Sequence, residues 1–283
     1  MSATAVVSHR TEVTEDQIDH LGHMNVRYYM NAAMHATRAM HERFSLDVET
    51  QVVQMYTRHL REQMLGASLE VRSGLASSSE SVRFYHELVN VETGDVAATF
   101  LHDVDHPALE APTLTIPPIG LPRSIDLETD AAARAPSAAE ALELGLVNRL
   151  PRVLTDQDTV GGAVVPPERA TWLIWDGEHP DGPQDWIRTG PDGERIGVAN
   201  MESRVTIRRL PEVGTTIQSF GAAVAVGEKI TRHMNWAFDM DRGELLVASE
   251  SIGLCFNIGE RRSMVIPPAM RADYESRLHP QFG

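Results

Sequence analysis

The stretch that decides the fold is Asp19-His20-Leu21-Gly22-His23-Met24-Asn25, which stands directly before a segment with helical spacing. Apolar and small side chains recur at the intervals of one helix face, so we expect a helix over residues 26–44. Asn25 suits the N-cap of that helix, and Gly22 lets the backbone turn tightly just before it. The stretch is therefore predicted to be a tight loop that leads into a long helix.

The rest of the chain predicts two similar units of one helix and several strands. Strand-like stretches follow the first helix at residues 51–57, 68–77, 81–91 and 95–104. A second helix is expected over residues 166–175, because prolines suit a first turn. Its strands are expected at residues 201–209, 215–226, 229–239 and 244–256.

Four short matches in the same order support an internal repeat. Ile116-Pro117-Pro118 and Ile266-Pro267-Pro268 lie 150 positions apart (266 − 116), and residues 58–66 resemble residues 204–214. Similar turns and similar unit starts complete the set, so we predict a tandem. The expected organisation is an N-terminal unit over residues 1–118, a linker over 119–147, a C-terminal unit over 148–268 and a tail over 269–283. One helix with an antiparallel sheet, twice over, is an α+β arrangement.

Composition excludes several classes of protein. The chain has 283 residues and a formal net charge of −15, which argues against nucleic acid as a partner. Neither a membrane-spanning stretch nor a signal peptide is recognisable. The single cysteine, Cys255, fits a reducing compartment, and we expect a cytoplasmic protein. The motifs of zincins, phosphate-loop hydrolases, dinucleotide enzymes and elbow-type serine esterases are absent, and we expect neither metal nor cofactor.

The opening stretch, followed by Tyr28-Tyr29, resembles the signature of hot-dog thioesterases, and more narrowly of the 4-hydroxybenzoyl-CoA thioesterase-like group. The resemblance covers residues 6–118 and 148–268, although only the opening motif is specific. It implies a double hot-dog, in which two antiparallel sheets each wrap around a central helix and pair as an intrachain pseudo-dimer. The second half keeps a thinner copy, with Asp158 and Gly161 but without the His-x-Asn extension.

The resemblance also implies roles for individual residues. Asp19 would attack the thioester or activate water, and His23 and Asn25 would orient water or polarise the carbonyl. Gly22 and Val26 would shape the loop so that an N–H faces the oxyanion. One departure is that many relatives carry a helical Glu where this chain has Met34-His35. The weaker candidates for substrate binding are Tyr28, Tyr29, Arg58 and His59. A weaker candidate for a second site is Asp158 with Gly161.

The expected function is hydrolysis of an acyl thioester, of CoA or of an acyl-carrier protein, to a free acid and a thiol. The expected partner is an acyl-CoA substrate, with no nucleic acid and no membrane, and the sequence leaves open whether the double hot-dog chain forms a homo-oligomer. One alternative is a non-catalytic hot-dog protein that only binds acyl thioesters. Another is a hot-dog enoyl-CoA hydratase or dehydratase, although its usual Asp-x-Asn-Pro-x-His string is absent.

Overall fold

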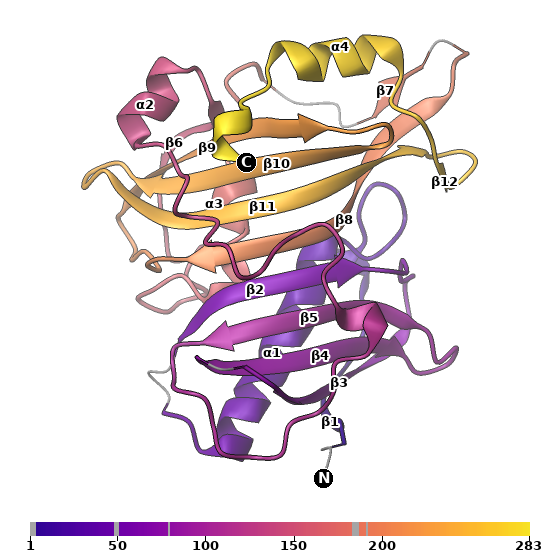
Figure 1. The fold of residues 1–283 in the computed structure, drawn as a ribbon, viewed down its shortest axis with the longest axis vertical. Helices are drawn as coiled ribbons and strands as arrows, with labels where there is room; N and C mark the ends of the chain where they lie inside the picture. The colour runs from indigo at the N-terminus through magenta and orange to yellow at the C-terminus, as the bar shows by residue number, and fades with distance from the viewer. Residues whose placement is uncertain (1–3, 48–50, 79, 183–186, 191) are drawn as a thin grey trace. The chain divides into compact units, whose positions relative to one another are not determined.

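The computed structural model describes residues 4–47, 51–78, 80–182, 187–190 and 192–283. The chain forms two compact units, residues 1–123 and 124–283, which are described separately below. The colours of Figure 1 separate them, because the first unit is indigo to magenta and the second reaches orange and yellow. Within the described residues, we find no helix that is both long and apolar enough to cross a membrane.

The first unit is a five-stranded antiparallel sheet packed against helix α1 (Val26–Phe44), with α1 behind the sheet in Figure 1. A short 3-10 turn, η1 (Glu15–Gln17), precedes the helix, and another, η2 (Pro118–Gly120), lies near the end of the unit. The strands lie in the order β1-β3-β4-β5-β2. Their bounds are β1 (Val6–Glu12), β2 (Val52–His59), β3 (Ser68–Ala76), β4 (Val82–Asn90) and β5 (Val96–Val104).

Helix α1 begins and ends where the sequence predicts. Asn25 caps it by accepting a hydrogen bond from the Arg27 N–H at 3.1 Å, and Ser45 ends it in the left-handed conformation. Its buried face includes Ala33 and Ala36, which are fully buried. Such small side chains allow a helix backbone to approach a sheet closely.

A buried polar cluster fixes α1 against the sheet. The Thr37 hydroxyl lies 3.0 Å from Nε2 of His86 and 2.7 Å from Nδ1 of His102, and Nδ1 of His86 lies 2.6 Å from the Ser73 hydroxyl. Both rings are fully buried. Burial lowers the pKa of His102 to about 3 and that of His86 well below its ordinary value, because a charged ring is costly away from water.

This cluster predicts a loss of stability in mild acid. As the pH falls below about 6.5, the unfolded chain binds protons that the folded His102 refuses, so the free energy of unfolding decreases by about 1.4 kcal/mol per pH unit for each such histidine. Urea unfolding between pH 7 and 4.5 measures this slope. His102→Gln is expected to flatten it by about one proton, whereas the exposed control His20→Gln leaves it unchanged. Equal slopes in all three proteins would contradict the assignment.

The second unit has its own five-stranded antiparallel sheet in the order β8-β11-β10-β9-β6. Two short strands, β7 (Arg188–Thr189) and β12 (Arg262–Ser263), pair with β8 and β11. The helix expected over residues 166–175 is present as a 3-10 turn and one short helix. The remaining bounds are β6 (Val147–Val153), β8 (Arg195–Ile207), β9 (Thr216–Val226), β10 (Ile230–Asp239), β11 (Glu244–Asn257), α2 (Ala138–Glu143), η3 (Pro167–Arg169), α3 (Trp172–Trp175), α4 (Pro268–Ser276) and η4 (Pro280–Phe282).

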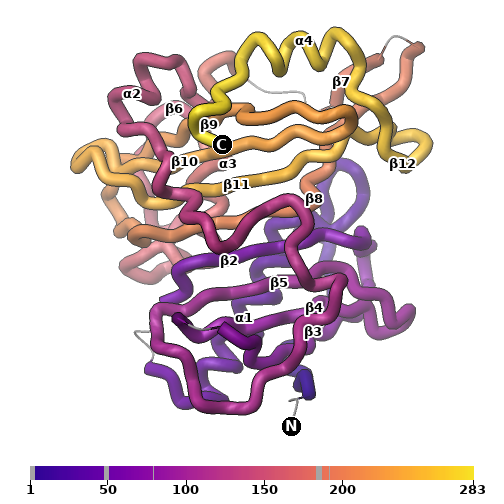
Figure 2. The backbone as a smooth tube through the Cα atoms, viewed as in Figure 1, coloured from indigo at the N-terminus to yellow at the C-terminus, as the bar shows by residue number. Residues whose placement is uncertain are grey.

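Most of the expected linker packs on one face of this sheet. Ala138 and Ala141 of α2 join a buried cluster with Phe220 and Trp236 of the strands, and Phe282 from the C-terminal turn completes it. Residues 124–147 and the tail 269–283 therefore belong to the second compact unit. In Figure 2, α2 and the C-terminus both lie beside this sheet.

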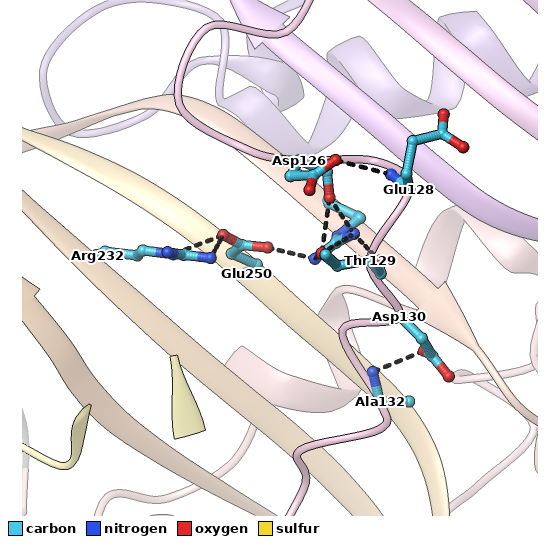
Figure 3. A network of polar contacts seen from close by, with 8 residues as sticks. Asp126, Glu128, Thr129, Asp130, Ala132, Arg232 and Glu250 are labelled. Carbon is cyan, nitrogen blue, oxygen red and sulfur yellow. Dashed lines mark hydrogen bonds and ion pairs between the residues drawn. The ribbon is translucent and has the colours of Figure 1, made fainter. Parts of the chain in front are cut away.

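A buried ion network holds residues 126–129, which lie within the expected linker (Figure 3). Glu250 accepts hydrogen bonds from Arg232 at 2.6 Å and from Arg204 at 2.5 Å. Arg204 also donates to the main-chain carbonyl of Asp126 at 2.7 Å and to that of Thr129. The side chains of Arg204 and Glu250 are 2% and 0% exposed, so water does not screen this contact.

Removal of one member should therefore destabilise the second unit. Arg204→Met leaves Glu250 with one cation and removes one donor each from the carbonyls of Asp126 and Thr129, and we expect the free energy of unfolding to fall by about 3 kcal/mol. Arg262→Met on exposed β12 is the matched control and should change it by less than about 0.5 kcal/mol. Urea unfolding curves of the three proteins test this, and equal values for both variants would show that the network is not a stabilising contact.

Candidate active site

The Asp19–Asn25 segment is a tight loop closed by its own backbone. The Asp19 N–H donates to the His23 carbonyl at 2.9 Å, and the Gly22 N–H donates to the Asp19 carbonyl at 3.0 Å. Gly22 has a φ of +86°, which glycine adopts without strain. The loop therefore positions Asp19 and His23 on one short turn.

The Asp19 carboxylate is engaged on both oxygens. Its Oδ1 accepts from the Leu21 N–H at 2.8 Å, and its Oδ2 lies 3.2 Å from Nδ1 of His23. Both side chains are largely buried, at 13% and 14% exposed. Asp19 thus holds the loop and orients the imidazole ring.

A second carboxylate, not foreseen from the sequence, lies at the other side of the ring. Oε1 of Glu62 is 3.5 Å from Nε2 of His23, and the Glu62 side chain is 37% exposed. Glu62 lies just beyond β2, where the Gln63 carbonyl accepts from the Met24 N–H at 2.8 Å. The contact joins residues that are far apart in the sequence. The only sequence feature that pointed to Glu62 was its acidic side chain in the repeated segment 58–66.

The start of α1 leaves one N–H available. The N–H groups of Met24 and Asn25 donate to the carbonyls of Gln63 and Gln17, and the Arg27 N–H donates to the Asn25 side chain. In the part of the chain that the structure describes, the Val26 N–H has no such acceptor, and Val26 is 44% exposed. A free N–H at a helix start attracts negative charge, which suits the oxyanion role predicted for Val26.

The two tyrosines make contacts close to the loop. The Tyr28 hydroxyl donates to the Asp16 carbonyl at 3.3 Å. The Tyr29 hydroxyl donates to the Arg61 carbonyl at 3.1 Å, and its ring meets the His59 ring edge-on at 5.4 Å. Burial lowers the pKa of His59 to about 4 and raises that of Tyr29. These contacts fix the strand end that carries Glu62, and substrate binding by these residues stays a prediction.

Arg58 lies near the end of the first unit. Its Nη1 donates to the carbonyls of Ile119 at 3.0 Å and Leu121 at 3.2 Å. These bonds attach the chain after η2 to strand β2. A role of Arg58 in substrate binding likewise stays a prediction.

A hollow of about 310 Å³ opens beside Glu62. It is lined by residues 61–67 and by the turn between β4 and β5, including Asn90 and Asp95. Glu62 is thus the member of the Asp19–His23–Glu62 group that borders open space.

The second unit makes a comparable backbone hydrogen bond without the same side chains. The Val165 N–H donates to the Pro211 carbonyl at 2.9 Å, as Met24 does to Gln63, and Gly161 has a φ of +78°. The residues that precede the bonded pair are Val164 and Leu210, where the first unit has His23 and Glu62. The backbone hydrogen bond therefore places no titratable side chain at this position of the second unit.

Asp158 is held by structural contacts. Its carboxylate accepts from Arg152 at 2.8 Å and from the Thr155 N–H at 2.9 Å. Burial alone would raise the pKa of Asp158, but these donors outweigh it and the pKa is lowered. The carboxylate thus caps a turn beside an arginine, and a catalytic role for Asp158 with Gly161 stays a prediction.

Histidines and the cysteine offer no further centre among the described residues. No group of three or more His, Cys, Asp or Glu side chains is placed to hold a metal ion in that part of the chain. His102 lies in the core beside Thr37, whereas His106 is half-buried and its Nδ1 lies 2.8 Å from the Pro107 carbonyl. Cys255 is buried, and burial raises the pKa of its thiol, so it lacks the features of a nucleophile.

Comparisons with known proteins bear on the fold. Residues 13–117 match the family model described as the thioesterase-like superfamily. A putative oleoyl thioesterase from Lactobacillus plantarum matches with a TM-score of 0.60 at 13% identity, over 89% of this chain and 96% of its own. The 12:0-ACP thioesterase from Umbellularia californica gives 0.59 at 9% identity, over 87% and 93% of the two chains.

An acyl-ACP thioesterase from Bacteroides thetaiotaomicron gives a TM-score of 0.60 at 10% identity, over 87% of this chain and 96% of its own. At these identities the likeness shows the fold. No curated protein matches the sequence significantly. Residues 13–117 are thus similar to the thioesterase-like superfamily, and the chain shares the fold of the thioesterase structures that it resembles.

Proposed function

We propose that this protein hydrolyses an acyl thioester to a free acid and a thiol, with Asp19, His23 and Glu62 as its catalytic group. The observation that carries the proposal is the imidazole of His23, which lies 3.2 Å from one carboxylate and 3.5 Å from another at the start of α1. Such a triad of acid, histidine and acid positions a base next to open space.

The exposures of the side chains assign the roles. Asp19 is the less exposed carboxylate and is held by a loop N–H, so it orients His23. Glu62 is the more exposed one and borders the hollow, so it takes a proton from water. The resulting hydroxide attacks the thioester carbonyl carbon, and the Val26 N–H donates to the oxyanion. The C–S bond then breaks, and the proton held by Glu62 goes to the leaving thiolate.

Asp19 as a nucleophile is the competing mechanism, and an isotope label separates the two. In a single turnover with excess enzyme in ¹⁸O-water, direct attack by water places the label in the product acid. Attack by Asp19 would instead expel the thiol and form an acyl–aspartyl anhydride, and water that opens this anhydride at the Asp19 carboxyl carbon leaves the label in the enzyme and an unlabelled oxygen in the product acid. We expect labelled acid, because both oxygens of Asp19 are already engaged.

The acyl carrier is CoA or an acyl-carrier protein, and the chain is proposed to consist of two hot-dog repeats. The matching hydrogen bonds of Met24 and Val165 support the repeat. Two of the similar structures are thioesterases of acyl-ACP by their descriptions, whereas the sequence motif resembles a CoA group. Parallel assays with acyl-CoA and acyl-ACP of the same chain length distinguish the carriers.

Variants of the three residues test the proposal directly. Glu62→Gln removes the base that takes the proton from water, and His23→Ala removes the ring that lies between the two carboxylates, so each variant is expected to lower kcat/KM by about 10²- to 10³-fold. Glu15→Gln, an exposed acid on η1 close to the same loop, is the matched control and should stay within about twofold. Release of free thiol from a panel of acyl-CoAs, measured with a chromogenic thiol reagent, gives the rates.

The alternatives predict different results in the same assays. Wild type that binds acyl-CoA but releases no thiol from short, long or aromatic substrates is a binding module, and the hydrolytic proposal is then wrong. Hydration of an enoyl-CoA, seen as loss of its ultraviolet absorption, would instead identify a hydratase. Full activity in Glu62→Gln would remove Glu62 from the mechanism.

A further inference from the structure

The helix α3 of the second unit has only four residues and packs against β9. The carbonyl of Ile174 in α3 accepts from the Ser219 hydroxyl of β9 at 2.8 Å, so α3 lies over the first half of that strand. Gly221 and Ala223 follow on the same face of β9 because side chains alternate along a strand. Beyond the end of α3 these small residues lie on the floor of a cavity of about 690 Å³. Cavities of this size hold small organic ligands.

Polar groups without partners lie on this floor. Asn235 of β10 is 4% exposed, and in the described residues its Nδ2 has no hydrogen-bond partner. Its Oδ1 lies 2.6 Å from where a Cβ on Gly221 would be, so glycine is needed to accommodate it. The Oδ1 of Asn200, on β8, is also buried and without a partner in that part of the chain. Buried polar groups are normally hydrogen-bonded, so these two point to a ligand.

The walls of the cavity are aromatic and cationic. Trp175 and Tyr274 of α4 both line it, and the Tyr274 ring meets the His233 ring edge-on at 5.9 Å. Arg188 and Arg277 also line the cavity, and Asp273 lies 3.4 Å and 2.5 Å from them. One carboxylate for two guanidinium groups leaves a positive charge at this wall.

The cavity lacks acidic residues although the protein is acidic. The chain carries a formal charge of −15, yet none of the described residues that line the cavity is Asp or Glu. Burial lowers the pKa of His233, which keeps its ring neutral and able to donate and accept. The local field therefore favours an anion, and the aromatic walls favour a flat ring.

We propose that this cavity is a second ligand site, which binds a small compound with a planar ring and an anionic group. The ring lies between Trp175 and Tyr274, its polar edge meets Asn235, and its anionic group faces Arg188 and Arg277. Aromatic carboxylates and nucleoside monophosphates share this chemistry. The site lies in the second unit and uses none of the residues of the Asp19–His23–Glu62 group.

Calorimetric titration of the full chain tests the proposal with two pairs of probes. Benzoate is compared with neutral benzamide, and AMP is compared with neutral adenosine. The anionic member of at least one pair should bind saturably and about tenfold more tightly than its neutral partner. The pair that binds identifies the source of the ligand. Two variants follow with the better probe: Arg277→Gln removes a charge, and Ala223→Leu fills the floor.

Both variants should weaken binding by at least about fivefold, while Arg262→Gln on β12 removes the same charge away from the cavity and should leave it unchanged. A thermal melt of each variant shows that the fold is retained. Absence of saturable binding of all four probes to the wild type would overturn the proposal. It would equally be overturned if Arg277→Gln and Ala223→Leu bound like the wild type, or if Arg262→Gln weakened binding as much as they do.

Discussion

The candidate active site depends on one backbone hydrogen bond, from the Met24 N–H to the Gln63 carbonyl. It joins the loop before α1 to the chain just after β2, and therefore places the preceding residues, His23 and Glu62, beside each other. The second unit makes the corresponding bond from Val165 to Pro211. The fold thus supplies the junction, and the side chains that precede it decide whether proton chemistry takes place there.

The two sheets differ in how much of one face a helix covers, because α1 and α3 differ in length. In the first unit α1 has 19 residues, and Thr37 reaches two buried histidines in the middle of the sheet. In the second unit α3 has four residues, and the face beyond Ser219 borders a cavity instead. Gly221 would be poorly suited to a packed core, because it adds no side chain; below a cavity it gives room to Asn235.

Local signals made the first helix predictable, whereas contacts distant in sequence were not. Asn25 and the small residues at helical spacing define α1 because capping and periodicity act within a few residues. The partnership of His23 with Glu62 leaves no periodic trace, so the sequence did not reveal it. Likewise, residues 124–147 read as a linker because the buried Arg204 that binds the carbonyls of Asp126 and Thr129 looks in the sequence like an ordinary surface charge.

The net charge of the chain illustrates the same limit for binding. A value of −15 argues against extended contact with nucleic acid, since that requires a basic surface. A small anion, however, responds to the groups within a few ångströms, because water and salt screen charges that are farther away. The cavity of the second unit presents two arginines and no acid among its described lining residues. Acidic composition and an anion site are therefore compatible, and only the folded arrangement of Arg188 and Arg277 shows it.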